Sequence, residues 1–428
     1  MALNGSFLLV FNMLMAPKNI NTNLPHSGFC NEFLIGSKYA QANRQPHNCL
    51  YKNMPIGYCI LKVTPLKALI LAGGFATRLR PLSCARPKTL FPIVNKSLLQ
   101  WTFERLANNG VDEVILAVNA LTQFYIRQHR PPNSGLKVRY SIDPPKMPLG
   151  TAGPVKKAEK LIGHDEPFIV LNGDIFADIN YKQLLETHRK SGALATIALC
   201  TVEDPCSFGV AELIDDNRIK RFIEKPAKGE APSNLINAGA YVLSPEVFKY
   251  IPEGRAVSIE REVFPKLAEE GKLFGYCMNG LWMDIGKPQE YLETNRIILD
   301  SQVKNPKLKT SETFEVKNPV ALDKGVSVGE KSVIGPYAIL GKNVKVGKNV
   351  QISNSVIFPD VEIGDFAILE GAIVGEGAHI GRHIKLGRGC IVGDQAKIRE
   401  GIHLPDGHAV CPAKEISENI LNPKPNLR

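Results

Sequence analysis

A glycine pair followed by two cations stands at the start of the first strongly patterned stretch of the chain. Gly73 and Gly74 end a short apolar run, and Arg78 and Lys88 follow them within residues 71–97. Glycines let backbone N–H groups approach phosphate oxygens closely, and fixed cations stabilise a triphosphate and a pyrophosphate leaving group. The spacing is neither GxGxxG nor that of a P-loop. A Gly-Gly pair alone is more often only a turn, but the whole string predicts a phosphate site.

Two aspartates have the positions that a metal site requires. Asp174 follows the apolar run 168–171, and Asp284 lies within the string WMDIG at 282–286. Taken alone, Asp174 is as well explained by a turn or a helix cap. Mg²⁺ prefers one or two carboxylates together with phosphate oxygens and water. Two strand-end aspartates on opposite sides of a crevice in an open sheet can supply such a pair.

The strings that contain these residues follow one another in a recognisable order. L-x-G-G-x-x-T-R-L-x-P-L with a following P-K resembles the signature of nucleoside-diphosphate-sugar pyrophosphorylases, the sugar-phosphate nucleotidylyltransferase family. The resemblance covers about residues 67–296, and it departs from the family pattern at Ala76, Thr89 and Ser97. The later landmarks are LGTAG at 149–153, NGD at 172–174, FG at 208–209, EKP at 224–226, NAG at 237–239 and WMDIG.

The resemblance implies a direct in-line displacement in which a sugar 1-phosphate attacks the α-phosphorus of an NTP and pyrophosphate leaves. It implies that Asp174 and Asp284 bind Mg²⁺ and that Arg78, Lys88 and Lys225 are catalytic. A neighbouring Glu-Lys pair such as Glu224-Lys225 is, without the resemblance, an ordinary solvated surface feature. The implied nucleotide-binding residues are Leu71, Ala72, Gly73, Gly74, Thr77, Arg78, Lys88, Gly150 and Thr151, and the implied sugar-phosphate residues are Gly209, Glu224, Lys225, Asn237 and Gly239.

The motifs indicate the reaction more clearly than they indicate the nucleobase and the sugar. The string GGFATRLRPL, together with LGTAGP and WMDIG, most resembles the branch of the family that uses GTP and mannose 1-phosphate. Branches that use UTP, dTTP or ATP with glucose 1-phosphate share nearly all of these motifs. We therefore expect GDP-mannose as the product, with the glucose 1-phosphate reactions as the alternative and a catalytically silent sugar-nucleotide sensor as an alternative of another class.

The elements that must position these residues alternate between short apolar runs and amphipathic segments. This alternation predicts an α/β domain over 67–299, with a doubly wound, mostly parallel, Rossmann-like sheet and ligands at the carboxyl ends of its strands. A polar stretch, 300–323, is expected to be a linker. The expected strands are 113–118, 138–142, 168–171 and 195–200, and the expected helices are 98–108, 154–161, 181–190 and 288–299.

The region 324–411 repeats an apolar residue followed by glycine every six residues. Val328-Gly329, Ile334-Gly335 and Leu340-Gly341 begin the series, and Val374-Gly375 resumes it after an irregular interval near 358–369. This period is typical of a left-handed parallel β-helix with about eighteen residues per coil, or roughly four coils between residues 327 and 405. Hexapeptide helices in acyltransferases use a catalytic histidine, so His379, His383, His403 and His408 leave acyl transfer open as a second activity.

The composition places the chain among ordinary globular proteins, with 44% hydrophobic and 22% charged residues. Residues 1–66 have no sustained period and are expected to be an extension outside the fold, and 412–428 a short basic tail. The formal charge of +10 is spread without a Lys/Arg block, which argues against nucleic acid as a partner. No run is long enough for a membrane span, and the nine cysteines form no CxxC pair, so we expect a cytoplasmic protein. The open ends of a β-helix favour a homo-oligomer.

Overall fold

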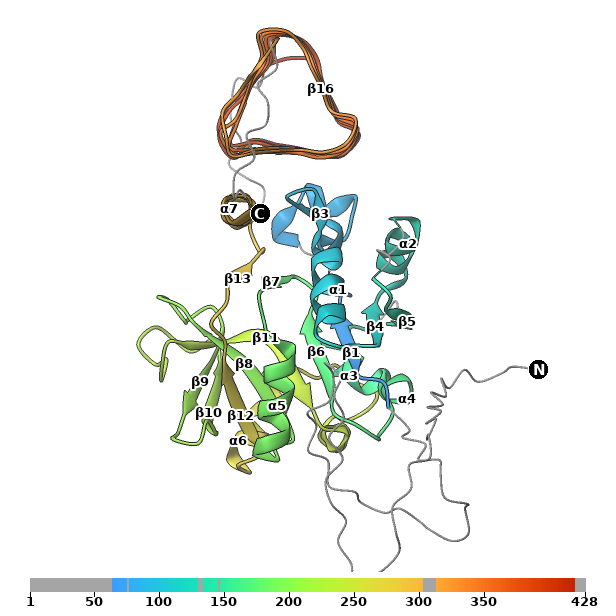
Figure 1. The fold of residues 1–428 in the computed structure, drawn as a ribbon, viewed down its shortest axis with the longest axis vertical. Helices are drawn as coiled ribbons and strands as arrows, with labels where there is room; N and C mark the ends of the chain where they lie inside the picture. Colours follow the sequence, from blue (N-terminus) through green and yellow to red (C-terminus); the bar gives the residue numbers. More distant parts are fainter. Residues whose placement is uncertain (1–63, 75–76, 130–133, 145–146, 303–312, 420–428) are drawn as a thin grey trace, which may run out of the picture. The chain divides into compact units, whose positions relative to one another are not determined.

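The computed structural model describes residues 64–74, 77–129, 134–144, 147–302 and 313–419. The predicted extension 1–66 therefore lies almost wholly outside the described residues, as does Ala76. An α/β region and a β-helix make up the described part of the chain (Figure 1).

The α/β region is built on a nine-stranded sheet in which β6, β1, β4 and β5 are parallel neighbours. Their carboxyl ends meet at one edge, where the predicted site residues follow them in the chain. The strands of the sheet are β1 (Lys67–Leu71), β4 (Glu113–Val118), β5 (Lys137–Ile142), β6 (Phe168–Asn172), β8 (Ala195–Thr201), β9 (Gly209–Leu213), β10 (Ile219–Glu224), β11 (Leu235–Leu243) and β12 (Leu273–Cys277).

Helices cover both faces of this sheet, which confirms the doubly wound prediction. Alternate residues of β1 show it: Leu69 packs in a core with Val155 and Phe264, whereas Ile70 packs in a second core with Phe103. The helices are α1 (Leu98–Asn108), α2 (Ala120–His129), α3 (Gly153–Lys157), α4 (Glu159–Ile162), α5 (Tyr181–Ser191), α6 (Phe264–Glu269) and α7 (Pro288–Gln302). The described helices do not include one that is both long and apolar enough to cross a membrane.

The other half of the sheet is mixed rather than parallel. β11 runs antiparallel to both β6 and β8, and β9 pairs antiparallel with β10. β9, β10 and β11 are not among the predicted strands. The segments between them are too short for crossover helices, so the alternation of strand and helix that predicted the other strands is missing here. These antiparallel strands carry the predicted sugar-phosphate residues.

The β-helix consists of three parallel six-stranded sheets, which confirms the predicted architecture. One sheet contains β14 (Glu315–Val316), β17 (Val333–Ile334), β20 (Gln351–Ser353), β23 (Ile368–Glu370), β26 (Lys385–Leu386) and β29 (His403–Leu404). The second contains β15 (Val320–Leu322), β18 (Ala338–Leu340), β21 (Ser355–Ile357), β24 (Ile373–Val374), β27 (Ile391–Val392) and β30 (Ala409–Val410). The third contains β16 (Ser327–Val328), β19 (Lys345–Val346), β22 (Glu362–Ile363), β25 (His379–Ile380), β28 (Lys397–Ile398) and β31 (Glu415–Ile416).

The strands of the β-helix extend past both predicted boundaries. β14 and β15 lie within the stretch expected to be a linker, where Val316 and Val320 take inward positions without a following glycine. The irregular interval also has a structural explanation: Val316 pairs with Ile334, but Leu340 pairs with Ile357, one residue fewer along the chain. Coils that are one residue shorter therefore interrupt the six-residue repeat in the sequence, while apolar side chains such as Leu340 and Ile357 still stack inside the β-helix.

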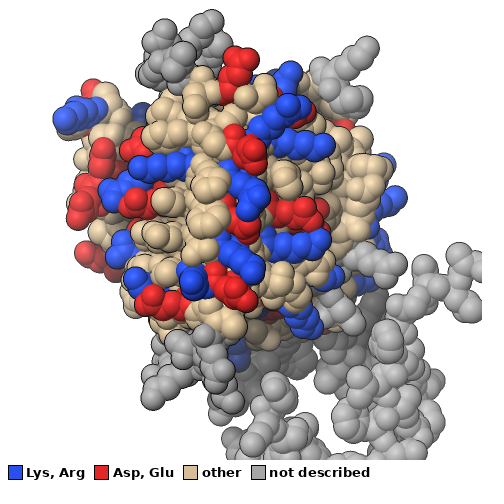
Figure 2. Space-filling view, turned by 90° about the horizontal axis from the view of Figure 1, so that it is seen from above, with Lys and Arg blue, Asp and Glu red and all other residues tan. Residues whose placement is uncertain are grey.

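Ion pairs link successive coils on the surface of the β-helix, for example Lys345 with Glu362 at 2.8 Å and Arg382 with Asp365 at 3.0 Å. Seen from above, acidic and basic side chains lie interleaved on the face that Figure 2 draws, so the cations are not gathered there in one basic patch. The charges on this face therefore largely neutralise one another, and each exposed pair contributes little to stability.

A separate apolar cluster joins the α/β region to the β-helix. Phe91 from the signature segment, Tyr291 from α7 and Phe358 from the β-helix are all fully buried in it. The Phe91 ring meets the rings of Tyr291 and Phe358 edge to face, with centroids 5.8 and 6.1 Å apart. The two regions therefore share a packed core rather than only a polar contact.

Candidate active site

A cavity of about 520 Å³ opens at the carboxyl ends of β1, β4 and β6. Such a position is where open α/β sheets bind ligands. Thr77 and Arg78 lie instead in a short 3-10 helix, Thr77–Leu79, where both are exposed and outside the cavity lining. The predicted site residues that line the cavity are Leu71, Ala72, Gly73, Gly74, Lys88, Gly150, Thr151 and Asp174.

Glycine is required at two of these positions. A Cβ on Gly73 would lie 2.9 Å from Oδ2 of Asp143, and a Cβ on Gly150 would lie 2.3 Å from the carbonyl oxygen of Val257. Gly150 also has a φ of +71°, in the left-handed region. A Cβ on Gly74, by contrast, would meet nothing within 4 Å, so this glycine leaves the backbone open toward the cavity.

The carboxylates of Asp174 and Asp284 meet at one cation, Lys88. Strands β7 (Ile175–Ala177) and β13 (Trp282–Asp284) pair antiparallel, and this places Asp284 opposite Ile175, next to Asp174. The buried Lys88 Nζ lies 3.3 Å from Asp174 Oδ2 and 3.5 Å from Asp284 Oδ1. Burial raises the pKa of Asp284, and the nearby Asp174 raises it further against the opposing effect of Lys88.

This carboxylate pair suits a divalent metal held jointly by protein and substrate. No group of three or more His, Cys, Asp or Glu side chains with the arrangement of a metal site occurs among the described residues. Two carboxylates are nevertheless the complement that Mg²⁺ takes from a protein when phosphate oxygens and water complete its shell. The residues present therefore fit a metal that arrives with the nucleotide.

The predicted sugar-phosphate residues lie on the antiparallel strands next to β6. Gly209 pairs with Glu224 across β9 and β10, and a Cβ on Gly209 would lie 2.5 Å from the Phe222 ring. Lys225 has a φ of +52°, uncommon for a residue with a Cβ, and its Nζ lies 3.6 Å from Glu224 Oε1. None of these three residues lines the 520 Å³ cavity.

Asn237 and Gly239 lie on β11, where Asn237 is tied to its own strand. The Asn237 side chain donates to the Tyr241 hydroxyl at 2.9 Å and accepts from the Gly239 N–H at 2.8 Å. Gly239 has a φ of +73°, and a Cβ there would lie 2.3 Å from the Ile175 side chain. These hydrogen bonds let the Asn237 side chain stabilise the β11 backbone next to β6 and β7.

Thr151 is held by an acidic side chain that the sequence analysis does not identify, Glu260. The Thr151 hydroxyl donates to Glu260 Oε2 at 2.5 Å and accepts from the Ile259 N–H at 2.9 Å. Glu260 also reaches Glu224 electrostatically: burial raises the pKa of Glu224, and the charge of Glu260 raises it further. Its signal in the sequence is weak: Glu260 lies in the first turn after the capping Ser258, where acidic residues also occur in ordinary helices.

Asp143 and Asn119 are two further cavity residues outside the predicted set. Asn119 donates to the Gly73 carbonyl at 3.0 Å and thus fixes the glycine turn. Asp143 follows β5, and its buried Oδ1 has no hydrogen-bond partner among the described residues. Burial raises the pKa of Asp143, while Lys157 acts in the opposite direction. Their position after parallel strands was the available signal, because such residues reach the ligand edge of the sheet.

A second cavity, of about 540 Å³, lies between α7 and the β-helix. Arg296, Tyr337, Glu370 and Arg388 contribute to its walls, and none of the predicted site residues does. It is therefore separate from the cavity that holds the glycine turn and Lys88.

Comparisons with known proteins cover both regions of the chain. Residues 67–301 match the model of the nucleotidyl transferase family, and residues 316–425 match that of the GMPPB C-terminal domain. The chain is 39% identical over 361 residues to mannose-1-phosphate guanyltransferase of Aspergillus fumigatus, an alignment that covers 83% of this chain and 98% of the fungal protein. It is 36% identical over 362 residues to mannose-1-phosphate guanylyltransferase 1 of Arabidopsis thaliana, covering 84% and 99% of the two chains.

A solved structure supports the fold of the α/β region. A putative glucose-1-phosphate thymidylyltransferase from Bacillus anthracis, in complex with a sucrose, matches with a TM-score of 0.50 and 24% sequence identity. The match covers 54% of this chain and 94% of the bacterial chain. At this identity the likeness concerns the fold alone.

Proposed function

The chain belongs to the nucleotidyl transferase family, and we propose that it transfers the guanylyl group of GTP to mannose 1-phosphate, giving GDP-mannose and pyrophosphate. The observation that carries this proposal is the meeting of Lys88, Asp174 and Asp284 at a glycine-lined cavity. Relatives that carry the name of this reaction align over nearly their whole length.

The glycine turn and Lys88 form the triphosphate end of the proposed site. Gly74 offers open backbone, and Asn119 holds the turn through the Gly73 carbonyl. Lys88 is a buried cation with two carboxylates at hand, so its ammonium group is fixed in direction before substrate arrives. Thr77 and Arg78, in the exposed 3-10 helix, are proposed to contact phosphates from the open side of the turn.

We propose that Mg²⁺ is the metal and that Asp174 and Asp284 hold it together with phosphate oxygens. When bound, the ion supplies charge neutralisation of the phosphates and a template for their alignment. Burial is the main cause of the raised pKa of Asp284, and the nearby Asp174 adds to it; a divalent cation between the two carboxylates would oppose both effects. Lys88, already held next to both carboxylates, would contact the phosphates from the same position.

The sugar 1-phosphate is proposed to lie toward β9, β10 and β11. Lys225 is half-exposed and free to follow the phosphate as a point charge, while Glu224 beside it accepts from sugar hydroxyls. Gly209 and Gly239 keep the strand surfaces flat, because a Cβ at either position would strike a neighbouring side chain. Asn237 braces β11 in the same wall.

The reaction is proposed to be a single displacement. A non-bridging oxygen of mannose 1-phosphate forms a bond to the α-phosphorus of GTP, and the bond from that phosphorus to the bridging oxygen of the β-phosphate breaks. The electron pair and the negative charge leave with pyrophosphate, so no proton transfer and no covalent enzyme intermediate are needed. Lys225 orients the attacking phosphate, and Lys88 and Arg78 stabilise the charge that develops on the leaving group.

Asp143 supports guanine as the base. Guanine presents two donors, N1–H and the 2-amino group, on one edge, and a carboxylate accepts such a pair with both oxygens. Asp143 lines the cavity with its Oδ2 beside Gly73, and its buried Oδ1 has no hydrogen-bond partner among the described residues. Adenine, uracil and thymine lack this pair of donors. Gly150 and Thr151 would contact the base through their backbone, since the Thr151 hydroxyl is already bonded to Glu260.

The β-helix histidines show no arrangement that favours acyl transfer. His379 pairs with Glu362 at 3.5 Å, His383 stacks on Phe366 with ring centroids 4.7 Å apart, and His408 contacts the Pro405 carbonyl at 2.9 Å. We further propose that the protein is cytoplasmic and forms a homo-oligomer. Among the described residues the end strands β14 and β31 each have one neighbour in their sheets, and such open edges favour contact with another subunit. Light scattering tests this, and a monomer at micromolar concentration would refute it.

The test of the proposed function is pyrophosphate release with Mg²⁺, crossing GTP, UTP, dTTP and ATP with mannose and glucose 1-phosphates. We expect turnover with GTP and mannose 1-phosphate to exceed that of every other pair. Preference for another pair would replace the substrates but keep the reaction. Absence of release from all pairs by folded protein would contradict the enzyme and favour a sensor, and consumption of acetyl-CoA would reveal acyl transfer.

A further inference from the structure

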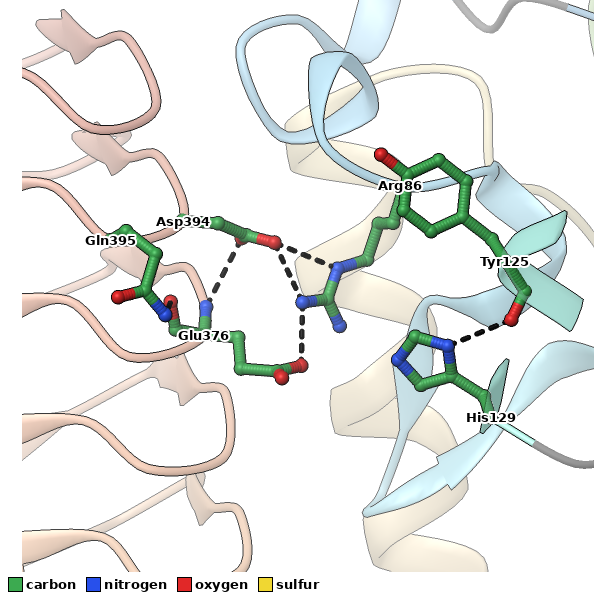
Figure 3. Close-up of polar contacts among 6 residues, drawn as sticks. All are labelled: Arg86, Tyr125, His129, Glu376, Asp394 and Gln395. Carbon is green, nitrogen blue, oxygen red and sulfur yellow. Dashed lines mark hydrogen bonds and ion pairs between the residues drawn. The ribbon is translucent and has the colours of Figure 1, made fainter. Parts of the chain in front are cut away.

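Arg86, in the signature segment, extends out of the α/β region and ends in the β-helix. Its side chain is only 8% exposed. Its Nε and Nη2 donate to Asp394 Oδ2 at 3.1 and 2.6 Å, and Nη2 also donates to Glu376 Oε2 at 2.6 Å (Figure 3). The guanidinium lies 5.0 Å from the centroid of the Phe358 ring. One arginine thus makes charge-assisted and ring contacts to three coil residues.

The acceptor site is itself rigid. Asp394 follows Gly393 at a corner of one coil, and its Oδ1 accepts from the Glu376 backbone N–H, on the preceding coil, at 3.1 Å. The Glu376 N–H therefore fixes one carboxylate oxygen of Asp394 while the other receives Arg86. Burial raises the pKa of Asp394, and Arg86 opposes this shift through its charge and hydrogen bonds. A buried charge of this kind is maintained only while its partner stays in place.

Arg86 lies two residues from Lys88. Pro87 separates them with a φ of −67°, and Lys88 begins a 3-10 helix, Lys88–Leu90. Phe91 then enters the shared apolar cluster against Phe358. Contacts with the β-helix therefore hold the chain on both sides of Lys88, and the segment between them has little freedom to move the ammonium group.

We propose that Arg86 is a positioning residue through which the β-helix fixes Lys88 in the active site. The proposal rests on the proposed function and adds to it that the β-helix, although it does not line the cavity, supports the catalytic site through residues 86–91. Arginine suits this role, because its planar guanidinium can donate to two carboxylates in fixed directions at once, whereas a lysine ammonium group acts as a point charge. Displacement of a catalytic group by about 1 Å costs on the order of a hundredfold in rate.

The test compares Asp394→Asn with a matched control, Asp365→Asn, in the full-length protein. Asp365 occupies the same kind of corner: its Oδ1 accepts from the Lys348 N–H at 2.8 Å and its Oδ2 pairs with Arg382, another β-helix residue, at 3.0 Å. Both substitutions remove one coil ion pair and keep an oxygen for the backbone N–H. Only Asp394→Asn withdraws one of the two carboxylates that Arg86 binds, the one that accepts from both Nε and Nη2.

We expect Asp394→Asn to lower kcat for pyrophosphate release by about tenfold to a hundredfold, with a smaller change in KM for mannose 1-phosphate. Hydrogen exchange in residues 86–91 should rise in the same variant. Asp365→Asn should change neither quantity. Arg86→Met should resemble Asp394→Asn, and the double variant should be no slower than the slower single variant, because both remove one contact.

Wild-type kcat and wild-type exchange in Asp394→Asn would overturn the proposal, as would equal losses in Asp365→Asn. If Arg86→Met does not fold, Asp394→Asn still decides, because it retains Arg86. A failure of the proposed function is distinguishable: wild-type protein would then release no pyrophosphate with any substrate pair, whereas the exchange comparison would still show whether the β-helix holds the Lys88 segment.

Discussion

The α/β region and the β-helix differ in whether their residue positions repeat along the chain. In the β-helix, six coils apply one local rule, and an inward residue such as Ile380 has an equivalent on the neighbouring coils. In the α/β region, each functional group follows a different strand and has no equivalent: Asp174 follows β6, and Asp284 ends β13. We therefore expect the chemistry in the non-repeating region. Within the β-helix we expect a functional role only where the repeat contacts another element, at Asp394.

The largest effect that separates the two regions should come from Lys88→Met. Removing the cation between Asp174 and Asp284 withdraws charge stabilisation from the leaving pyrophosphate, so we expect kcat to fall by about a thousandfold. Arg388→Met, which removes a cation of the β-helix that pairs with Glu370, is the matched control. Steady-state pyrophosphate release measures both, and equal losses would show that the chemistry is not confined to the α/β region.

A substitution within the repeat should act on stability instead. Ile380 is fully buried in the β-helix core, so Ile380→Ala should lower the free energy of unfolding by about 2–5 kcal/mol and leave kcat unchanged. Ile368→Ala, at an exposed position of the same coil, should cost less than half as much. Urea unfolding followed by circular dichroism gives the first quantity. A fall in kcat in Ile380→Ala, whose side chain lies in the β-helix core rather than at the Arg86 contact, would argue that the packed core, not one corner, supports the site.

Acid should destabilise the α/β region selectively. Burial, together with the charge of Arg189, lowers the pKa of His188 to about 4, and its two ring nitrogens contact Thr196 and Ser244 at 2.9 Å. Between about pH 6.5, the pKa of histidine in the unfolded chain, and about pH 4 the unfolded chain binds more protons than the folded protein. The contribution of His188 to the free energy of unfolding is therefore fully present above about pH 6.5, and it falls by roughly 3 kcal/mol as the pH drops to about 4.

Tryptophan fluorescence reports this loss, because both tryptophans, Trp101 and Trp282, belong to the α/β region. His188→Gln should flatten the pH dependence of unfolding between about pH 4 and 6.5. His164→Gln, at an exposed site of the same region, is the control and should leave the dependence intact. An unchanged slope in His188→Gln would contradict the assignment.

The smallest predicted effect concerns the base. Asp143→Asn replaces one acceptor oxygen by a donor, so we expect the preference of kcat/KM for GTP over ATP to fall by about 1–3 kcal/mol, or roughly tenfold to a hundredfold. Asp112→Asn, another aspartate of the α/β region outside the cavity lining, serves as the control. An undiminished preference for GTP in Asp143→Asn would remove Asp143 from base recognition.

The sequence predicts local elements better than it predicts partners. The span 98–108 and the span 113–118 are confirmed to the residue, since the helix has a Ser97 cap and the strand is fully buried. The predicted helix at 154–161 is divided into α3 and α4 at Ala158. The six-residue pattern predicts a shorter β-helix than the structure shows. It misses the first strands, which lack the following glycine, and it is interrupted where a coil is one residue shorter.

The site shows the same limit. The order of the landmarks predicts which residues belong to it, and Lys88, Asp174 and Asp284 indeed meet. Nothing in the pattern indicates that Arg86 pairs with residues about three hundred positions away, because two acidic residues at coil corners look like any solvated charges. Contacts between distant segments depend on the packing of whole elements, which local period and propensity do not contain.

Tracing the phosphate oxygens of mannose 1-phosphate into the products tests nucleotidyl transfer most directly. Mannose 1-phosphate labelled with ¹⁸O at its bridging and non-bridging phosphate oxygens would be converted with unlabelled GTP, and both products weighed by mass spectrometry. Attack on the α-phosphorus predicts that all labelled oxygens remain in GDP-mannose and none enters pyrophosphate. Label in pyrophosphate, or loss of the bridging label from the sugar nucleotide, would contradict nucleotidyl transfer as the reaction of this site.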